Sequence, residues 1–365
     1  MPPSDAALMR RALALARRAR GQTSPNPMVG AVVARGGRVI AEGYHRRAGQ
    51  PHAEAIALER AGPRARGATL YVTLEPCCHQ GRTPPCTDAV IASGVRRVVA
   101  AMRDSNPLVA GKGLARLRRA GIEVQVGVLE EEARRLNEAY SHFITTGRPF
   151  VTLKLAASLD GKIASRTRES RWITGQQARF HVHRLRAESD AVMVGIGTAL
   201  ADDPRLTGRL GAPRQPVRIV VDSLARLPTD AAMLREPGGR VIVAATRRAP
   251  KPRVDALRRA GAEVLFVRAR GGRVDLGPLL DALGRREITS VLVEGGSELA
   301  GSLLDERLVN RFVLFLAPIL IGGKEAPTIA GGKGVAHLRD ALRLDHLTLR
   351  RLGPDLLITA YPMAP

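Results

Sequence analysis

Apolar residues recur in two alternating patterns along the first 145 residues. Short apolar runs predict buried strands, and apolar residues three or four positions apart predict helices. We expect a first helix over residues 6–20 that starts near Ser4 and Asp5, strands at Met28–Ala34, Val39–Tyr44, Thr69–Leu74, Val95–Ala101 and Glu123–Gly127, and helices at His52–Ala61, Thr87–Ser93, Gly113–Ala120 and Glu130–His142. Such alternation predicts a mixed sheet with helices on both faces.

A segment with turn chemistry, Thr145–Pro149, ends this region, and a second α/β alternation follows. We therefore place a domain boundary near residue 147, which divides the chain into residues 1–146 and 147–365. Expected strands of the second half are Phe150–Leu155, Ala191–Gly195, Val217–Asp222, Val241–Ala245, Glu263–Val267, Ser290–Glu294, Phe312–Pro318 and Leu352–Tyr361, with a helix at Glu298–Leu304.

The composition is that of an ordinary globular protein of 365 residues, with 45% apolar and 25% charged residues. No apolar run approaches the ~18 residues that a membrane helix needs, so no membrane association is expected. Three cysteines exclude a disulfide scaffold and leave a metal site or a thiol nucleophile open.

The net charge of +23 says little about function. Only six of the 57 basic residues are lysine, and the arginines are scattered along the chain, whereas a nucleic-acid binder usually gathers its charge on one face. An enzyme with anionic substrates fits the charge at least as well. Residues 6–20 have the composition of a transit peptide, but their helical spacing favours a folded helix, and there is no secretory signal. We therefore expect a cytoplasmic protein.

The strongest chemical signal lies between residues 52 and 86. It reads His52-Ala53-Glu54 and then PCCHQGRTPPC from Pro76 to Cys86. One histidine and two cysteine thiolates are good zinc ligands, and a catalytic zinc keeps its fourth position for water, whose pKa it lowers. Glu54 is suited to carry protons between that water and a leaving amine. Cys86 follows a proline at a predicted helix start, where the helix field favours a thiolate.

Two further residues, Cys78 and His79, leave alternatives open. Cys78 is adjacent to Cys77, and adjacent cysteines do not easily reach one tetrahedral ion. A closed structural zinc site with His79 as fourth ligand gives Glu54 no role. H-x-E followed by P-C and a second cysteine is typical of zinc nucleobase deaminases. Eight residues separate Cys77 from Cys86 here, where that signature has two.

Three strings in this half resemble the deaminase domain of the bifunctional riboflavin-biosynthesis deaminase/reductases. They are GRTPP between the cysteines, SPNPMVGAVV at 24–33 and DSNPLVAGKG at 104–113. The resemblance implies a cytidine-deaminase-like three-layer α/β/α domain that deaminates a diamino-ribosylamino-pyrimidinone 5′-phosphate. It also implies Zn²⁺ bound by His52, Cys77 and Cys86, with Glu54 as proton carrier. The positions that match its substrate pocket are Asn26, His45, Arg82, Asp104 and Asn106, among which Arg82 suits a phosphate.

Glycine turns follow two predicted strands of the second half, at Gly195–Gly197 and at Gly295-Gly296. The backbone N–H groups of such turns can bind phosphate. Neither turn reads as a full G-x-G-x-x-G, so a simple tight turn is the alternative. Taken alone, Trp172 indicates core filling as readily as a site, and the ADDPRLT string at 201–207 indicates a capped turn.

Four strings nevertheless resemble the reductase half of the same family, in the family's order. They are LKLAASLDGKIA at 153–164, WITG at 172–175, ADDPRLT at 201–207 and VEGGSELAGSLL at 293–304. The resemblance implies a dihydrofolate-reductase-like α/β domain that uses NADPH to reduce the ribosyl group to ribityl. Asn310-Arg311 replaces a frequent Asp-Glu of the family at a strand entry, which affects little of the chemistry.

The resemblance also carries over the residues of this second site. Implied cofactor contacts are Ala156, Trp172, Thr198, Asp202, Ser223, Gly296, Ser297, Glu298, Leu299, Ala300, Gly301 and Ser302. Implied substrate contacts are Ser170, Arg186, Leu206, Arg209 and Glu294, with Lys154 and Asp160 added to the lining of the site. Arg186 and Arg209 suit the 5′-phosphate.

The sequence thus predicts a zinc-dependent deaminase fused to an NADPH-dependent reductase, acting on a phosphorylated pyrimidine. The rivals are a tRNA or other nucleic-acid deaminase with an accessory domain and a non-catalytic zinc protein. A homo-oligomer, dimer or tetramer, is expected from the family resemblance alone. The residues do not decide between NADPH and NADH, nor whether the intermediate is channelled.

Overall fold

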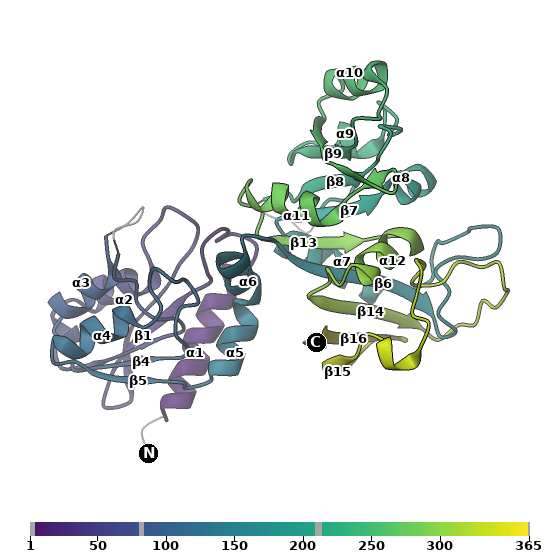
Figure 1. Cartoon of the computed structure of the whole chain (residues 1–365). Helices are drawn as coiled ribbons and strands as arrows, with labels where there is room; N and C mark the ends of the chain where they lie inside the picture. Colours follow the sequence, from purple (N-terminus) through teal and green to yellow (C-terminus); the bar gives the residue numbers. More distant parts are fainter. Residues whose placement is uncertain (1–3, 80–83, 209–213, 364–365) are drawn as a thin grey trace. The chain divides into compact units, whose positions relative to one another are not determined.

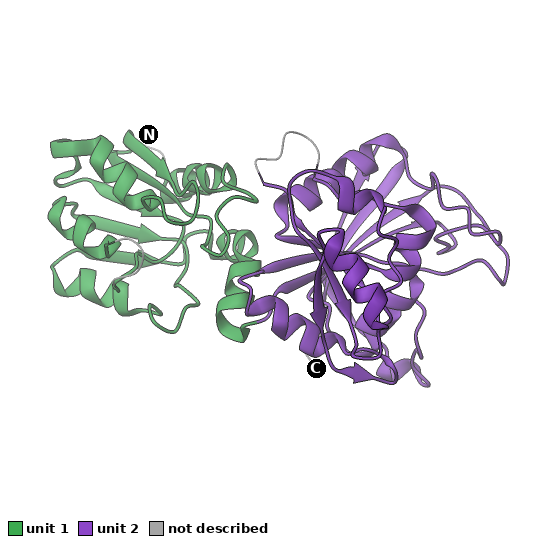
Figure 2. Cartoon of the chain, turned by 90° about the horizontal axis from the view of Figure 1, so that it is seen from above, with its two compact units in different colours: residues 1–147 green, residues 148–365 purple. Residues whose placement is uncertain are grey.

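The chain folds into two compact units, residues 1–147 and residues 148–365 (Figure 1, Figure 2). The computed structural model describes residues 4–79, 84–208 and 214–363. Each unit is built around a sheet of its own, with five strands in the first and nine in the second. Within the described ranges, no helix combines the length and the apolar character needed to cross a membrane.

The sheet of the first unit is mixed, as the alternation of elements predicts. Its strand order is β2-β1-β3-β4-β5. Strand β1 runs antiparallel to β2 and β3, while β3, β4 and β5 are parallel to one another. The strands are β1 (Gly30–Arg35), β2 (Arg38–Tyr44), β3 (Thr69–Val72), β4 (Arg97–Ala100) and β5 (Glu123–Val126).

Helices precede and follow these strands, and most lie where the apolar spacing predicts them. The helices are α1 (Asp5–Arg17), α2 (Ala53–Ala61), the short 3-10 helix η1 (Gly62–Ala65), α3 (Cys86–Ala92), α4 (Lys112–Arg119), α5 (Glu130–Leu136) and α6 (Glu138–Thr146).

Helices α1 and α2 cover opposite faces of the sheet. A Cβ at Gly30 would lie 2.0 Å from the carbonyl oxygen of Ala12 on α1, and a Cβ at Gly43 would lie 2.4 Å from that of Ala53 on α2. Gly43 pairs with Ala31, the neighbour of Gly30, so the two glycines face opposite sides of the sheet. Both helices come so close to the sheet that only glycine fits at these positions. The sheet and the helices on its two faces form three layers.

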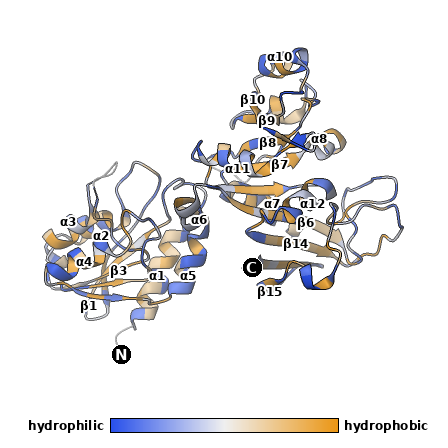
Figure 3. Ribbon diagram, in the orientation of Figure 1, coloured by the Kyte–Doolittle hydropathy of each residue, from blue (hydrophilic) through white to orange (hydrophobic). Residues whose placement is uncertain are grey.

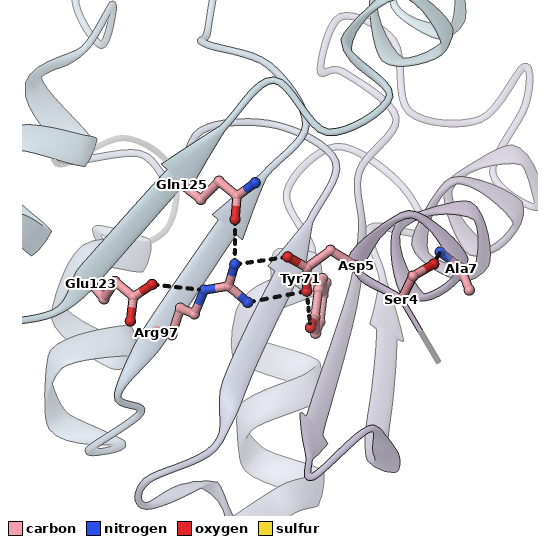
Figure 4. Close-up of polar contacts among 7 residues, drawn as sticks. All are labelled: Ser4, Asp5, Ala7, Tyr71, Arg97, Glu123 and Gln125. Atoms are coloured by element: carbon pink, nitrogen blue, oxygen red, sulfur yellow. Dashed lines mark hydrogen bonds and ion pairs between the residues drawn. The ribbon is translucent and has the colours of Figure 1, made fainter. Parts of the chain in front are cut away.

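Polar contacts attach α1 to the sheet (Figure 4). The hydroxyl of Tyr71 on β3 donates to Asp5 Oδ1 at 2.7 Å, and Arg97 Nη2 on β4 donates to Asp5 Oδ2 at 2.7 Å. Arg97 Nε also lies 3.1 Å from Glu123 Oε1 on β5. One helix start is thereby joined to three strands.

The single helix predicted at Glu130–His142 is wrong, because α5 ends and α6 begins at Asn137. The Asn137 side chain accepts from the Met28 N–H at 2.8 Å and donates to the Met28 carbonyl at 3.0 Å. The amide thus satisfies the backbone just before β1, and a backbone φ of −109° at Asn137 interrupts the helix. Helical periodicity continues across this point, so the break has no signature in the apolar pattern.

The second unit has a mostly parallel sheet in the order β10-β9-β8-β7-β13-β6-β14-β16-β15. All neighbours from β10 to β14 are parallel, and the last two strands are antiparallel. The strands are β6 (Phe150–Ser158), β7 (Ala191–Gly195), β8 (Val217–Val221), β9 (Val241–Ala245), β10 (Glu263–Phe266), β13 (Ser290–Glu294), β14 (Arg311–Ala317), β15 (Leu344–Leu352) and β16 (Asp355–Pro362).

Helices connect the parallel strands, and the hydropathy colouring shows apolar residues concentrated along central strands such as β13 (Figure 3). This arrangement confirms the predicted α/β class. The remaining elements are α7 (Gln176–Glu188), α8 (Ile196–Asp202), α9 (Ala232–Arg235), α10 (Lys251–Arg259), α11 (Leu276–Gly284), α12 (Ser297–Asp305), η2 (Leu338–Asp340) and the two-stranded ribbon of β11 (Ala269–Arg270) and β12 (Arg273–Val274).

The last strand predicted at Leu352–Tyr361 corresponds to β16, which begins three residues later, but the strand before it, β15, was not predicted. Two antiparallel strands, β15 and β16, meet at Gly353-Pro354, where Gly353 has a φ of +65°. Strand β15 forms the edge of the sheet, and nearly all of its side chains are exposed. It therefore lacks the buried apolar run by which the other strands are recognised in the sequence.

Candidate active sites

Three candidate metal ligands from separate segments converge in the first unit. His52 is the N-cap residue of α2, Cys86 is the first residue of α3, and Cys77 follows β3. His52 Nδ1 lies 3.0 Å from Cys86 Sγ and 3.7 Å from Cys77 Sγ, and all three atoms lie within 4.8 Å of one another. Ligands bonded to one tetrahedral zinc are separated by about 3.5–4 Å. The donor set fits zinc, and the three atoms are close enough to reach one ion, although His52 and Cys86 lie nearer to each other than two zinc-bound ligands would.

Glu54 lies on the first turn of α2, beside this cluster. Its side chain is 3% exposed, and its Oε2 has no hydrogen-bond partner among the described residues. Burial raises the pKa of Glu54 to about 7. A buried carboxyl group with a free oxygen and a pKa near neutral is suited to accept and return a proton.

Cys77 accepts hydrogen bonds from its neighbours in the cluster. The thiol of Cys86 and the His52 ring lower the pKa of Cys77, against the opposing effect of burial. The Cys86 backbone N–H, at the start of α3, also donates to Cys77 Sγ at 3.3 Å. The start of α3 therefore favours a thiolate at Cys77, in addition to the effect predicted for Cys86 at the same helix start.

The other candidate ligands are not part of the cluster that the described residues form. Cys78 is half-buried next to Cys77, and the Nδ1 atom of His79 is buried without a hydrogen-bond partner among the described residues. Since neither joins the three ligands, the arrangement favours an open catalytic site over a closed structural one.

Two predicted pocket residues lie against the cluster. The Asn26 side-chain amide is 3.1 Å from His45 Nε2, and His45 Nδ1 is 3.2 Å from the Pro51 carbonyl oxygen. The His45 ring meets the His52 ring edge-on, with centroids 5.2 Å apart. Burial lowers the pKa of His45, which favours a neutral ring.

Two more predicted residues, Asp104 and Asn106, share a loop after β4. Asp104 Oδ1 accepts from the Asn106 N–H and from the Tyr140 hydroxyl, both at 2.9 Å. Burial raises the pKa of Asp104, and the negative charges of Glu75 and Cys77 add to the shift. Arg82, the predicted phosphate partner, lies outside the described residues.

Sequence reasoning missed Tyr140 and Glu75, which both hold this loop. The buried Glu75 carboxylate accepts from the backbone N–H groups of Asp104, Gly111 and Leu114, at 2.9–3.2 Å. An acidic residue directly before Pro76 was the available signal for Glu75. Nothing in the sequence pattern of α6 distinguishes Tyr140 from a core aromatic.

A buried charge cluster lies in the second unit, where β13 ends. The Arg186 guanidinium donates to both oxygens of Glu294, with Nη2 to Oε2 at 2.9 Å, and Lys154 Nζ lies 3.4 Å from Oε2. Burial raises the pKa of Glu294, but the charges of Arg186 and Lys154 outweigh burial and lower it to about 2. The structure thus joins three of the predicted residues in one network.

The two glycine turns of the second unit lie side by side. Gly295 follows the last residue of β13 and Gly296 is the N-cap of α12, while Gly195 is the N-cap of α8. A Cβ at Gly296 would lie 3.2 Å from Thr198 Oγ1, and a Cβ at Gly195 would lie 3.7 Å from the Leu299 Cβ. Thr198 and the start of α12 therefore form one surface with several backbone N–H groups, a good anion site.

Predicted cofactor residues around this surface have mixed environments. Trp172 is 70% exposed, with the Arg179 guanidinium 4.6 Å from its ring centroid, so it does not fill the core. Ser170 Oγ donates to Asp202 Oδ1 at 3.3 Å. Ser223 Oγ accepts from the Val274 N–H at 3.0 Å. Ala156 on β6 and Ser297 and Ser302 on α12 are half-buried, as are Thr198, Asp202, Ser223 and Gly296, and Glu298 on α12 is exposed.

Several residues predicted to contact the cofactor or the substrate are buried inside the fold, and others lie elsewhere. Leu206 is 1% exposed, and Leu299, Ala300 and Gly301 are buried on α12. The Asp160 carboxylate accepts from the N–H groups of Ile321 and Gly322, which fixes a surface loop. Arg209 lies outside the described residues.

Two family models match the chain in the same order as these sites. The "cytidine and deoxycytidylate deaminase zinc-binding region" matches residues 2–102, and the "RibD C-terminal domain" matches residues 149–358. The chain is also 44% identical over 362 residues to the riboflavin biosynthesis protein RibD of Actinobacillus pleuropneumoniae, covering 99% of this chain and 96% of that protein. The chain belongs to the RibD family. RibD of Escherichia coli is likewise 44% identical, with 97% and 98% covered.

Solved RibD structures have the same fold. Acinetobacter baumannii RibD superposes with a TM-score of 0.87 at 39% identity, covering 99% of both chains. A Thermotoga maritima diaminohydroxyphosphoribosylaminopyrimidine deaminase/5-amino-6-(5-phosphoribosylamino)uracil reductase gives a TM-score of 0.86 at 39% identity, with 98% and 99% covered. As a RibD family member, the protein is a bifunctional riboflavin-biosynthesis enzyme, a zinc-dependent deaminase and an NADPH-type reductase. These matches confirm the resemblance and do not favour a nucleic-acid deaminase.

Proposed function

We propose that residues 1–146 catalyse the deamination and residues 147–365 the reduction. The substrate of the first step is 2,5-diamino-6-ribosylamino-4(3H)-pyrimidinone 5′-phosphate. The second step reduces the ribosyl side chain of the deaminated product and gives 5-amino-6-ribitylamino-uracil 5′-phosphate. The convergence of three metal ligands in one unit, and of two glycine turns beside a buried charge cluster in the other, supports this division.

In the deaminase, His52, Cys77 and Cys86 hold the zinc. A zinc ion bound by this donor set supplies Lewis-acid activation of water. Glu54 accepts a proton at its free Oε2 and donates it to the departing amine. Asn26, His45, Asp104 and Asn106 hold the pyrimidine, and Arg82 binds its phosphate.

In the reductase, the surface formed by Thr198 and the start of α12 binds the phosphates of the cofactor through backbone N–H groups. NADPH bound there supplies the hydride. Glu294 and Arg186 orient the ribosyl chain, and Arg209 binds the 5′-phosphate. Trp172, exposed at the surface, provides a flat apolar face for the cofactor.

One observation carries the deaminase proposal, namely the buried, unpartnered Glu54 oxygen beside the His52, Cys77 and Cys86 cluster. The test is Glu54→Gln, assayed for zinc content, ammonia release from the phosphorylated diaminopyrimidinone, and NADPH oxidation with the deaminated product. We expect one zinc per chain, ammonia release at least about 10²-fold slower, and unchanged NADPH oxidation. Full ammonia release by the zinc-loaded variant would refute the role of Glu54. Failure of the unaltered enzyme in either assay would refute that half of the proposal.

We also infer that the enzyme is a cytoplasmic homo-oligomer, a dimer or tetramer. Strand β15 supports the oligomer, since it is an open sheet edge on which Leu344, Leu347 and Leu349 are each more than 40% exposed. Uncovered edge strands with apolar side chains pair readily with another chain. Light scattering of the unaltered enzyme and of Leu347→Lys tests this. A monomeric unaltered enzyme contradicts the inference.

A further inference from the structure

Helix α6 contacts the loop that carries two of the proposed pyrimidine-binding residues. The Tyr140 hydroxyl donates to Asp104 Oδ1 at 2.9 Å. One residue further along each segment, Ser105 Oγ donates to Ser141 Oγ at 3.0 Å. Burial raises the pKa of Tyr140, so its hydroxyl stays protonated and can only donate to a carboxylate. Tyr140 therefore acts on the side chain of Asp104.

The hydrogen bonds of Asp104 fall on one of its two oxygens. Oδ1 accepts from Tyr140 and from the Asn106 N–H, both at 2.9 Å. No described residue donates to Oδ2, and Asp104 is 8% exposed. Two donors on one oxygen fix the plane of the carboxylate and leave the second oxygen available to a ligand.

The course of the loop is held by other contacts. The Glu75 carboxylate accepts from the N–H groups of Asp104, Gly111 and Leu114. A Cβ at Gly113 would lie 2.1 Å from the Pro76 carbonyl oxygen, so the start of α4 packs directly on the segment that leads to the zinc ligands. Because these contacts hold the backbone, loss of the Tyr140 hydroxyl would free the Asp104 side chain and leave the loop in place.

We propose that Tyr140 is a positioning residue of the deaminase, which orients Asp104 so that Oδ2 accepts a hydrogen bond from an N–H group of the pyrimidine substrate. This inference rests on the proposed function, in which Asp104 lines the pyrimidine pocket. The proximity of Asp104 to the zinc cluster agrees with it, since the Asp104 N–H donates at 3.2 Å to Glu75, two residues before the ligand Cys77.

The first test compares Tyr140→Phe with Tyr71→Phe in the full-length, zinc-loaded enzyme. Tyr71 is a matched control, because its hydroxyl also donates to a carboxylate, Asp5, at 2.7 Å in the same unit (Figure 4). We expect Tyr140→Phe to raise the deaminase KM about tenfold, the loss typical of one hydrogen bond to a charged group, with kcat within about twofold. Zinc content and reductase activity should not change, and Tyr71→Phe should leave the deaminase KM unaltered.

The second test is a double-mutant cycle with Asp104→Ala. If Tyr140 acts through Asp104, Tyr140→Phe adds no further increase in KM to the Asp104→Ala enzyme. Equal effects of Tyr140→Phe in both backgrounds, or equal effects of the two tyrosine variants, would overturn the inference. An Asp104→Ala enzyme with unaltered KM would overturn it as well. An unaltered enzyme that releases no ammonia would instead overturn the proposed function itself, so the two failures are distinguishable.

Discussion

Arg186 on α7 and Glu294 at the end of β13 form a bidentate ion pair whose side chains are only 16% and 9% exposed. Lys154 on β6 adds a second positive charge 3.4 Å from the same carboxylate. The three side chains join α7 to the neighbouring central strands β13 and β6. They meet at the carboxyl end of β13, and ligands usually bind at the carboxyl ends of strands in α/β sheets. A group that binds substrate in the proposed function therefore also holds the sheet and helix together.

Glu294→Gln should destabilise the second unit, because it leaves Arg186 and Lys154 buried without a compensating charge. We expect a loss of about 3 kcal/mol at pH 7 in urea unfolding. Glu306→Gln is the control, since its partner Arg270 is 68% exposed, and it should cost less than about 1 kcal/mol. Equal losses in the two variants would contradict a special role for the buried pair.

The same carboxylate predicts how stability changes in acid. The pKa of Glu294 is lowered from 4.5 to about 2 in the folded protein. Its stabilising contribution is therefore complete above pH 4.5 and is lost as the pH falls through about 2. Unfolding free energies measured from pH 5 to pH 2 should fall less steeply for Glu294→Gln than for the unaltered protein. Parallel curves would show that Glu294 does not titrate in this window.

Replacement of each cysteine in turn should distinguish the zinc ligands Cys77 and Cys86 from Cys78, which is not part of the ligand cluster. Cys77→Ser and Cys86→Ser each remove one of the three convergent ligand atoms, so we expect loss of zinc and of ammonia release. Cys78→Ser is the matched control and should retain one zinc per chain and normal deamination. Zinc content by atomic absorption decides the matter. Zinc loss in Cys78→Ser would make Cys78 a ligand.

Gly301 on α12 is a position where the fold requires glycine. A Cβ there would lie 2.3 Å from the carbonyl carbon and oxygen of Gly331, in a segment that packs along the helix. Gly301→Ala should therefore lower stability by about 1–3 kcal/mol and weaken NADPH binding, because α12 or its neighbour must shift. Gly277→Ala on α11 is the control, since its Cβ would meet only Asp275 Oδ1, at an ordinary contact distance of 3.8 Å. Thermal unfolding and NADPH titration of both variants test this.

Most of the architecture could be predicted from the apolar pattern, since buried strands carry continuous apolar runs. The predicted metal ligands come together in space because proline and helix starts are local features that fix where His52 and Cys86 lie. Strand β15 could not be recognised, because an exposed edge strand has no buried face to mark it. The break at Asn137 was equally hidden, since it depends on a contact with Met28, more than a hundred residues earlier.

The long-range polar contacts of the deaminase site could not be predicted from the sequence either. Glu75 and Tyr140 both bind Asp104, from which they are separated by 29 and 36 residues in the sequence. Neither stands in a periodic pattern, and an isolated glutamate or tyrosine is most often a surface or core residue. Conversely, Leu206 stood in a family motif, but its side chain is buried in the core.

Arg218 provides the last prediction, since an arginine lies fully buried in β8, within a strand recognised by its apolar residues. Its guanidinium donates to the backbone carbonyl groups of Met233, Glu236, Gly238 and Gly239. The Arg218 side chain has no exposed surface, so these carbonyl groups are the main partners of its charge, and burial lowers its pKa.

Arg218→Met should preserve the packing volume but leave these four carbonyl groups without their donor. Because each buried, unsatisfied polar group costs about 1–3 kcal/mol, we expect a loss of at least about 3 kcal/mol and faster amide exchange over residues 233–239. Arg240→Met is the control, since its side chain is 61% exposed and its acidic partner is 4.0 Å away. If both variants unfold at the same urea concentration, the carbonyl groups find other partners, and Arg218 does not hold this segment.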